Sequence, residues 1–215
     1  MNTVETTLKA AKSLIPIGNE FHARGWSVGT SSNYSRVVSQ EPLQLVVTAS
    51  GKDKGRLTES DFARVDASGK PIDADAPKSS AETLLHVAIA QQFPSVTAIL
   101  HTHSIWGTLL SRRFGDAGGF TLAGFEMLKG LEGIKTHETR YFVPIFENTQ
   151  DIPTLVAQLE ARFSVGDEAE DAIHHGFLIR GHGLYTWGDD LFAARRHIEI
   201  FEFLFECFAR EQGLG

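Results

Sequence analysis

The sequence has 215 residues, a length that suits one large domain or two small ones. Hydrophobic residues make up 42% and charged residues 22%, a globular balance that excludes disorder as the dominant state. Lys and Arg number 20 against 27 Asp and Glu, and the formal charge of -7 argues against a surface for nucleic acid or anionic membranes. Because Cys207 is the only cysteine, no intrachain disulfide can form, and we expect a reducing, cytoplasmic environment.

The chain shows no internal repeat and no long linker. Residues 1–21 mix Glu5, Lys9 and Lys12 with short apolar stretches, so we expect no signal peptide. No stretch is long and apolar enough to predict a membrane-spanning helix. The most loop-like stretch, residues 66–80, is too short to separate two cores. We therefore expect a single domain over residues 1–215.

Hydrophobic periodicity predicts alternating helices and strands. In chain order we expect a helix over 3–24 with a kink near Pro16, a strand over 43–48, a weak hairpin over 62–67 and 71–73, a helix over 80–92, a strand over 96–102, helices over 104–112 and 122–131, a strand over 140–146, a helix over 153–163, strands over 176–180 and 183–187, and a helix over 189–211 capped by Asp189. Pro144 indicates an edge strand or a bulge. The last helix is apolar over much of its girth, which predicts burial on two sides. Such a mixture gives a layered α/β architecture.

A pair of histidines ends the strand expected over 96–102. His101 and His103 are separated by one residue, so their side chains point to the same face, about 6–7 Å apart at the backbone. Two imidazoles in this position can bind one metal ion. The alternative is a pair of hydrogen-bonded histidines in a polar cleft. Metal binding is favoured because burying unpaired histidines costs free energy.

His182 is the candidate for a third ligand. It lies between two glycines at the connection of two short strands, and glycines permit a tight backbone path. An exposed turn histidine is the simpler alternative, and His174, His175 and His197 are rival ligands. Three histidines with an open position are typical of catalytic zinc, and one cysteine excludes a Cys-rich structural site.

Two carboxylates are candidates for acid/base chemistry. Glu82 lies in the first turn of the helix expected over 80–92, where it could equally be a partner of the helix dipole. Glu126 has apolar neighbours in the sequence, so we expect a raised pKa that suits proton transfer. The alternative for Glu126 is a surface residue of a helix.

Three polar loops could hold a phosphate group. Each combines hydroxyls, amides or a cation near a strand end or a helix start, where free N–H groups favour an anion. The candidate substrate-binding residues in these loops are Asn33, Thr48, Ser50, Gly51, Lys52, Ser79 and Ser80. Loops of this composition are also ordinary turns. Neither a G-x-G-x-x-G nor a Walker motif occurs, so the sequence does not support nucleotide binding.

Five short motifs occur in a particular order: Ser-Asn-Tyr-Ser from residue 32, Thr-Ala-Ser-Gly from 48, Ser-Ser-Ala-Glu-Thr from 79, His-Thr-His from 101 and Gly-His-Gly from 181. This ordered set resembles the class II aldolase/epimerase family of zinc enzymes that act on phosphorylated sugars. The resemblance implies a three-layer αβα fold whose central, mostly antiparallel sheet is covered by helices on both faces. It also implies one Zn²⁺ per subunit on His101, His103 and His182, a sugar phosphate substrate and a homotetramer.

Within this family, residues 124–131 and 143–151 are most similar to a dehydratase branch that acts on a 5-methylthio ketose 1-phosphate in methionine salvage. If this chain follows the dehydratases, the resemblance implies that Glu126 is the acid/base. If it follows the aldolases, the resemblance implies that Glu82 has this role. Both carboxylates are present, so the sequence does not choose between them. Dehydration and aldol cleavage share a metal-stabilised enediolate, and the placement of the acid/base separates the two reactions.

Other functions remain to be weighed against this one. A class II aldolase or epimerase acting on another sugar phosphate is the enzyme alternative. A non-catalytic metal-binding interaction protein is the alternative from a different class. A metallo-β-lactamase-like site would need Asp where Ile105 stands, and a cupin would need Glu within residues 104–109, which hold none.

Overall fold

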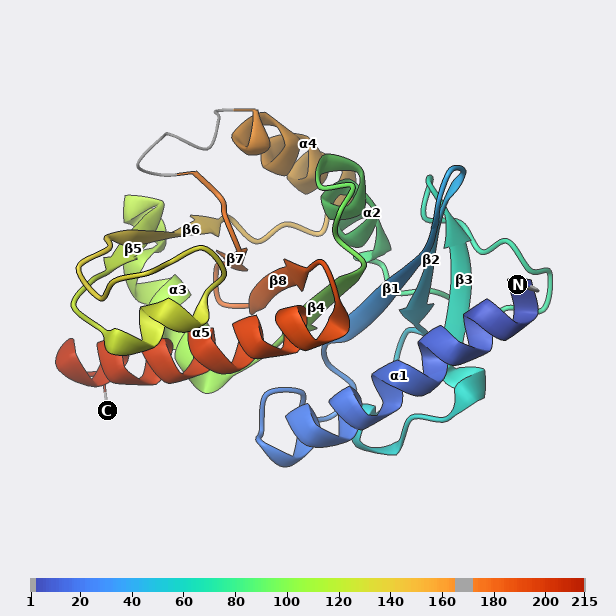
Figure 1. Ribbon diagram of the computed structural model, residues 1–215, viewed down its shortest axis with the longest axis horizontal. Helices are drawn as coiled ribbons and strands as arrows, with labels where there is room; N and C mark the ends of the chain where they lie inside the picture. The colour runs from blue at the N-terminus through green and yellow to red at the C-terminus, as the bar shows by residue number, and fades with distance from the viewer. Residues whose placement is uncertain (1–2, 165–171, 215) are drawn as a thin grey trace.

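The computed structural model describes residues 3–164 and 172–214, and within them one eight-stranded sheet runs through the centre (Figure 1). The strand order is β3-β2-β1-β4-β8-β7-β6-β5. The strands are β1 (Asn33–Gln40), β2 (Leu43–Thr48), β3 (Phe62–Asp66), β4 (Ala98–Thr102), β5 (Gly119–Leu122), β6 (Tyr141–Phe146), β7 (Gly176–Ile179) and β8 (Leu184–Gly188). The β6–β7 pair is parallel and the other neighbouring pairs are antiparallel, which confirms the expected sheet.

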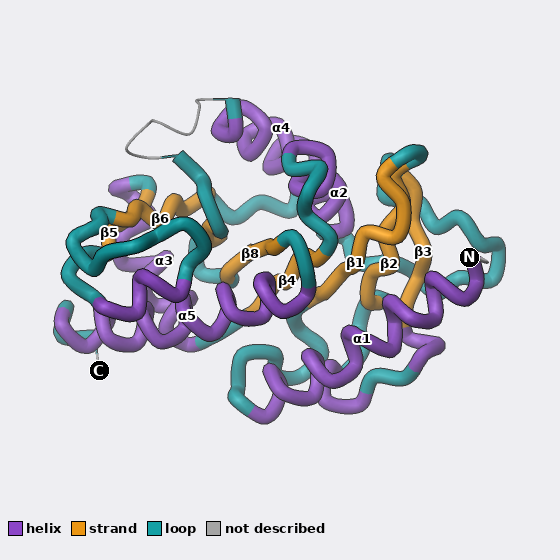
Figure 2. Tube along the Cα trace, in the orientation of Figure 1, coloured by secondary structure: helices purple, strands orange, loops and turns teal. Residues whose placement is uncertain are grey.

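Helices cover both faces of this sheet, as expected for three layers (Figures 1 and 2). The α-helices are α1 (Thr3–Ala23), α2 (Thr83–Gln92), α3 (Ile105–Phe114), α4 (Ile152–Phe163) and α5 (Leu191–Glu211). Residues of α2 and α4 pack in one hydrophobic cluster, and residues of α1, α3 and α5 pack in the other. Among the residues described, no helix combines the length and the apolar character that crossing a bilayer requires.

Alternation along the strands separates the two hydrophobic clusters. In β4, Ile99 belongs to the cluster on the α2 and α4 side, whereas Leu100 belongs to the cluster on the α1 and α5 side. In β2, Val47 belongs to the cluster on the α2 and α4 side, and Val46 belongs to the cluster on the α1 and α5 side. Successive side chains of a strand point to opposite faces, so a strand covered on both faces is apolar without interruption. This arrangement also determines which face each polar residue at a strand end will join.

Some boundaries differ from the sequence expectations. The helix expected over 122–131 is wrong, because the chain there forms β5 and then a short 3₁₀-helix, η4 (Glu126–Gly130). Residues 71–73 contribute one isolated bridge, Val65 to Pro71, rather than a strand. The sequence analysis missed β1 altogether, since its polar start reads as a loop.

Pro144 does not mark an edge strand, because β5 lies outside β6. Its partner in β5 is Gly119, and pairing of β6 with β7 begins one residue later, at Ile145. The missing N–H of Pro144 therefore removes no hydrogen bond between β6 and β7.

The start of α2 is also later than expected. The helix begins at Thr83, and Glu82 occupies the N-cap position without a side-chain hydrogen bond to the helix backbone. The Glu82 carboxylate is therefore free to point toward other elements.

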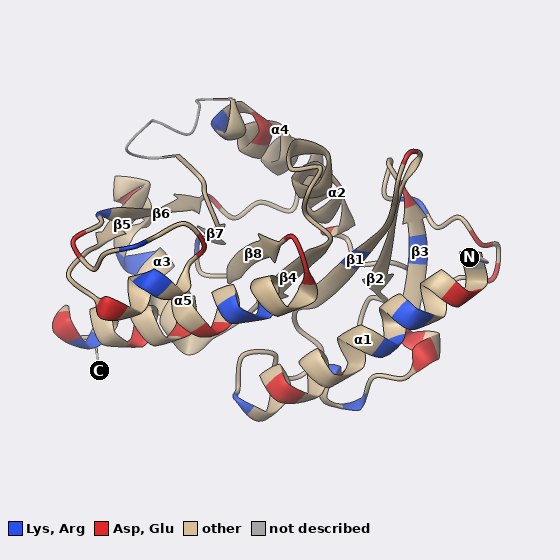
Figure 3. Cartoon of the chain, in the orientation of Figure 1, with Lys and Arg blue, Asp and Glu red and all other residues tan. Residues whose placement is uncertain are grey.

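Charged residues of both signs lie along α1 and α5 (Figure 3). The Arg195 guanidinium contacts the Glu20 carboxylate at 2.7 Å, and Arg24 contacts Glu199 at 2.8 Å, so α1 is linked to α5. The buried residues of α5 face the sheet and its neighbouring helix, whereas Phe192 and Phe203 remain exposed on this chain.

The N-cap of α5 is Asp190, not Asp189, because the Asp190 side chain accepts the main-chain N–H of Ala193 at 2.7 Å. We predict that Asp190→Ala lowers the free energy of unfolding by about 1 kcal/mol. Asp189→Ala is the matched control; its side chain accepts the Ser95 hydroxyl at 2.7 Å at the surface and caps no helix N–H, so the loss should be smaller than that of Asp190→Ala. Urea denaturation of both variants measures the difference, and equal losses would contradict the assignment.

Candidate active site

Three histidines converge at one end of the central strands. His101 lies in β4, His103 directly follows it, and His182 lies in the turn between β7 and β8. The His101 Nε2 atom is 2.8 Å from the His103 Nε2 and 3.4 Å from the His182 Nε2. The candidate ligand atoms of the three residues lie within 4.8 Å of one another. The structure thus brings together the three histidines that the sequence analysis selected.

The surroundings of His101 leave its Nε2 free to bind a cation. Its Nδ1–H donates to the Leu184 carbonyl at 2.9 Å, and this bond selects the tautomer with an Nε2 lone pair. Burial, reinforced by the neighbouring histidines, holds the pKa of His101 well below its usual range. Burial, with smaller contributions from His182 and the Lys54 ammonium, lowers the pKa of His103 to about 4. Neutral imidazoles with converging nitrogens are a donor set that fits a divalent metal.

Backbone contacts hold the other two candidate ligands in place. The main-chain N–H of His103 donates to the Trp26 carbonyl at 2.7 Å. Gly183 approaches β4 so closely that a Cβ there would lie 2.0 Å from the Thr102 carbonyl oxygen. A glycine is required at this position, and it lets the turn carry His182 back to the end of β4.

Glu82 completes the cluster from the start of α2. Its Oε1 is 3.2 Å from the His182 Nε2, and its Oε2 is 3.6 Å from the His101 Nε2. The carboxylate also accepts hydrogen bonds from the Asn33 side-chain amide and the Tyr185 hydroxyl, both at 2.8 Å. A carboxylate oriented in this way can act as a further metal ligand or as a proton acceptor.

A buried histidine behind the site orients Asn33. The His86 ring contacts the Asn33 Oδ1 through Nε2 and the Ser35 Oγ through Nδ1 at 2.8 Å. With its oxygen turned to His86, the Asn33 amide donates from Nδ2 to Glu82 and to Ser80. The sequence analysis missed His86 and Tyr185. Tyr185 is the cross-strand partner of His101, and only the order and register of the strands reveal this.

A cleft of about 200 Å³ opens beside the histidines. Its lining residues are Thr30, Ser31, Ser32, Asn33, Ala49, Ser50, Gly51, Ser80, Ala81, Glu82, His103 and His182. Four of the seven candidate substrate-binding residues are thus in the lining. Hydroxyls, amides and the start of α2 give the cleft the character of an anion site.

The other three candidates lie outside this lining. The Thr48 Oγ1 accepts the main-chain N–H of Tyr34 at 3.1 Å and is buried. The Lys52 Nζ is paired with Asp61 at 2.8 Å. Ser79 forms an isolated bridge with Ala49.

Lys54 is a buried cation that the sequence analysis missed. Its ammonium group donates to the Thr30 carbonyl at 3.3 Å and to the Lys52 carbonyl at 2.6 Å, which joins two loops around the cleft. Burial lowers the pKa of Lys54 to about 8. No pattern in the sequence marks this residue for burial.

Glu126 is not part of this cleft in the same chain. It lies on η4, exposed, with its carboxylate paired to Lys129 and near His137. The Lys129 ammonium holds the pKa of Glu126 below its ordinary value, so the expected rise is wrong for the single chain. Apolar neighbours in the sequence do not cover this carboxylate, because the short 3₁₀-helix presents it to solvent.

The rival histidines serve another part of the structure. The His175 Nε2–H donates to the Glu132 carbonyl at 2.8 Å, and the Glu132 N–H donates to the His197 Nε2 at 3.4 Å. These two histidines hold the segment after η4 against the body of the protein.

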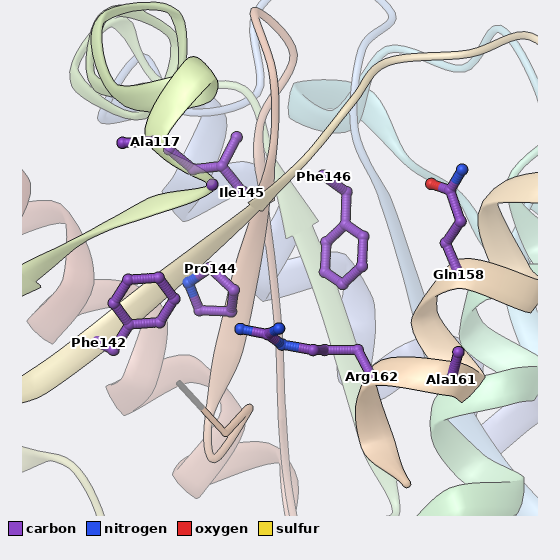
Figure 4. A pocket seen from close by; sticks show the side chains of 9 residues that line it. Ala117, Phe142, Pro144, Ile145, Phe146, Gln158, Ala161 and Arg162 are labelled. Atoms are coloured by element: carbon purple, nitrogen blue, oxygen red, sulfur yellow. The ribbon is translucent and has the colours of Figure 1, made fainter. Parts of the chain in front are cut away.

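A larger surface cleft of about 520 Å³ lies between β6 and α4 (Figure 4). Phe142, Pro144 and Phe146 face Gln158 and Arg162 across it. Its described lining contains no His, Cys, Asp or Glu. It therefore offers neither a metal-ligand set nor a carboxylate base, and the smaller cleft is the candidate active site.

A family model described as the class II aldolase and adducin N-terminal domain matches residues 12–209. The chain belongs to this family. It is 46% identical to the methylthioribulose-1-phosphate dehydratase of Marinobacter nauticus over 198 residues, which covers 92% of this chain and 91% of that protein. It is 45% identical over 193 residues to the protein of the same name from Xanthomonas campestris pv. campestris (strain 8004), covering 89% and 85% of the two chains.

Solved structures show the same fold. An L-fuculose 1-phosphate aldolase superposes with a TM-score of 0.76 at 19% identity, covering 96% of this chain and 88% of that one. The L-fuculose-1-phosphate aldolase of Thermus thermophilus gives a TM-score of 0.70 at 19% identity, covering 95% and 98%.

The buried histidines predict acid-sensitive stability in the metal-free protein. Burial lowers the pKa of His86 and of His175 to about 3, so between pH 6.5 and 4.5 the unfolded chain binds protons that the folded chain does not. Glu202 has the opposite sign, because burial raises its pKa to about 7. The lowered pKa values of His101 and His103 add to the effect of His86 and His175, so the unfolded chain takes up at least one net proton more than the folded chain. The free energy of unfolding should therefore decrease by at least about 1.4 kcal/mol for each unit by which the pH is lowered.

Urea denaturation of metal-free protein at several pH values measures this slope. His175→Gln removes one of the depressed groups, so its slope between pH 6.5 and 4.5 should be shallower than that of the wild type. A pH-independent stability across this range would refute the prediction.

Proposed function

We propose that the protein catalyses the zinc-dependent dehydration of 5-methylthioribulose 1-phosphate to 5-methylthio-2,3-dioxopentyl phosphate, a step of methionine salvage. The observation that carries the proposal is the convergence of three histidines and the Glu82 carboxylate beside a cleft suited to an anion. The dehydratase names of relatives that match about nine-tenths of the chain support this substrate.

The residues of the cleft suit this substrate. The Ser50 and Ser80 hydroxyls and the N-terminal end of α2 can bind the phosphate. His101, His103 and His182 would hold the metal, for which we propose zinc. When bound, the metal would supply Lewis-acid stabilisation of the charge that develops on the substrate oxygens.

The reaction needs one group to accept a proton and one to donate a proton. The C3–H bond breaks, the C4–O bond breaks, and the leaving hydroxyl departs as water; the remaining enol then becomes a ketone. We propose that Glu82 takes the C3 proton, since it already lies in the cleft. We assign to Glu126 the proton that the leaving C4 hydroxyl requires.

Glu126 can serve the cleft only if a second copy brings it there. We therefore propose a homotetramer in which Glu126 of the partner subunit completes each site. Met127 beside Glu126, and Phe203 on α5, the helix that packs against η4, are exposed apolar side chains that support burial between copies. Burial at such an interface would raise the pKa of Glu126, so that the carboxyl would keep its proton near neutral pH and could donate it to the leaving hydroxyl.

Mass spectrometry of the products tests the reaction itself. Zinc-loaded protein should convert methylthioribulose 1-phosphate into a diketone phosphate that has lost one water. Cleavage to dihydroxyacetone phosphate and an aldehyde would instead establish the aldolase alternative, which the position of Glu82 favours. An unchanged substrate would overturn the proposed reaction and direct attention to other sugar phosphates or to a non-catalytic metal protein.

Removing one ligand tests the metal centre. We predict that His101→Ala loses zinc and activity together, because two imidazoles cannot retain the ion as three do. Metal analysis of the purified protein, together with the rate, measures both. A zinc-replete, active variant would remove His101 from the ligand set, and Fe²⁺ or Mn²⁺ in place of zinc would correct the metal.

Substitution of the two carboxylates tests their roles. Glu126→Gln should keep zinc and lower kcat by roughly 10²–10⁴-fold, the usual contribution of a general acid or base. Glu82→Gln should lower kcat as well. An ordinary kcat in either variant would exclude that carboxylate from catalysis.

Mixed tetramers test whether the site is shared between subunits. The Glu126→Gln protein, with its lowered kcat, and the His101→Ala protein, without zinc, should together gain activity above either variant alone when they are unfolded and refolded as a mixture. Some sites then combine an intact His101 with an intact Glu126 from the other subunit. Mixtures that remain inactive would place both residues in the same subunit's site.

A further inference from the structure

The strand that carries His101 has a second polar face. His101 points to the α2 side of the sheet, where it meets Tyr185 and Glu82. Thr102 is the next residue of β4, so its side chain points to the opposite side, toward α5. There the Thr102 hydroxyl lies 3.3 Å from the Glu202 Oε1.

Glu202 is an unusual residue for its position. It belongs to the buried stripe of α5, among Ile198, Phe201 and Phe205, and it is 3% exposed. Its second carboxyl oxygen, Oε2, has no hydrogen-bond partner among the residues described. A buried carboxyl with an unpaired oxygen costs stability that an apolar side chain of similar size would not. The reason for a glutamate at this position therefore lies in the hydrogen bond that its carboxyl accepts, not in the stability that its packing supplies.

The hydrogen bond of Glu202 lies directly before one metal-ligand candidate, because Thr102 immediately precedes His103. Burial raises the pKa of Glu202 to about 7, and the hydroxyls of Ser104 and Thr102 are the two groups that oppose this rise. These hydroxyls immediately precede and follow His103. The Ser104 Oγ accepts the Gly107 N–H at 3.0 Å as the N-cap of α3, so Ser104 is held at the start of that helix.

We propose that Glu202 is a positioning residue for the metal centre, which fixes the turn from β4 to α3 and so holds His103 in its ligating position. The proposal rests on the proposed metal site. Residues 102–104 connect a strand to a helix, and the main chain of His103 has one hydrogen bond of its own there, to Trp26. The Glu202 carboxyl supplies a fixed acceptor for the Thr102 hydroxyl, directly before His103.

Hydrogen-bond acceptance, not charge, is the property that matters in this role. A glutamine keeps the acceptor oxygen at the same reach and is neutral. A methionine has a similar length and no comparable acceptor. Glu202→Gln should therefore preserve the function that Glu202→Met removes.

Zinc affinity of the intact protein is the primary measurement, by competition with a chromophoric chelator at one pH. Outer residues around metal ligands typically change metal affinity by 10–100-fold, and we expect Glu202→Met to weaken zinc binding by about tenfold or more. Glu202→Gln should bind zinc as tightly as the wild type. The matched control is Glu206→Met, on the same helix but partly exposed and paired with Arg210, and it should leave the affinity unchanged.

Two further readouts separate positioning from a general structural role. The thermal stability of metal-free Glu202→Met should be equal to or above that of the wild type, because a buried carboxyl is removed. The visible absorption of the Co²⁺-loaded protein should change in Glu202→Met and not in Glu202→Gln. A Met variant that binds zinc normally, or a Gln variant that loses affinity as severely as Met, would overturn the proposal.

The metal site and the role of Glu202 can fail separately. If the wild type binds no more zinc than His101→Ala does, the proposed metal site is wrong and the Glu202 proposal falls with it. If the wild type binds zinc through His101 and Glu202→Met binds it equally well, the Glu202 proposal alone fails. Should Glu202→Met not fold, Thr102→Val removes the same hydrogen bond with nearly the same shape, and unaltered zinc affinity in that variant would refute the role.

Discussion

The antiparallel register of β1, β4 and β8 is the constraint on which the site depends. It places Asn33 and Tyr185 directly beside His101, one on each neighbouring strand. Both side chains then reach Glu82, which the start of α2 supplies from the same side of the sheet. A shift by one residue in either pairing would turn these groups to the opposite face. The register of the sheet therefore sets the position of His101 and of the two side chains that hold the Glu82 carboxylate.

Desolvation gives the same cluster its chemical character. Burial lowers the pKa values of His101 and His103, so both rings remain neutral and present lone pairs at neutral pH. On the opposite face of β4, burial also disfavours the charged form, but for a carboxyl this raises the pKa, as it does for Glu202. One strand thus separates two neutral metal-ligand candidates, His101 and His103, from the buried Glu202 carboxyl, which contacts Thr102 at the end of that strand.

Local patterns in the sequence predicted much of this correctly. The spacing of His101 and His103 follows from strand periodicity, and the layered fold follows from the alternation of apolar segments. The prediction for Glu126 failed in its pKa because sequence neighbours do not report solvent exposure: η4 is short and leaves the carboxylate beside Lys129. The cap of α5 shifted from Asp189 to Asp190 for a similar reason, since main-chain geometry selects the capping residue.

The sequence by itself determined which residues could do chemistry: three histidines, two carboxylates and several hydroxyl-bearing loops. Those choices depend on residue type and short-range spacing, which the chain order contains. Only the tertiary structure decided that Glu82 joins the histidines while Glu126 lies apart in the same chain. It alone showed His86, Tyr185 and Lys54 around the cleft. Their places depend on strand order, cross-strand register and burial, which arise when segments distant in sequence pack together.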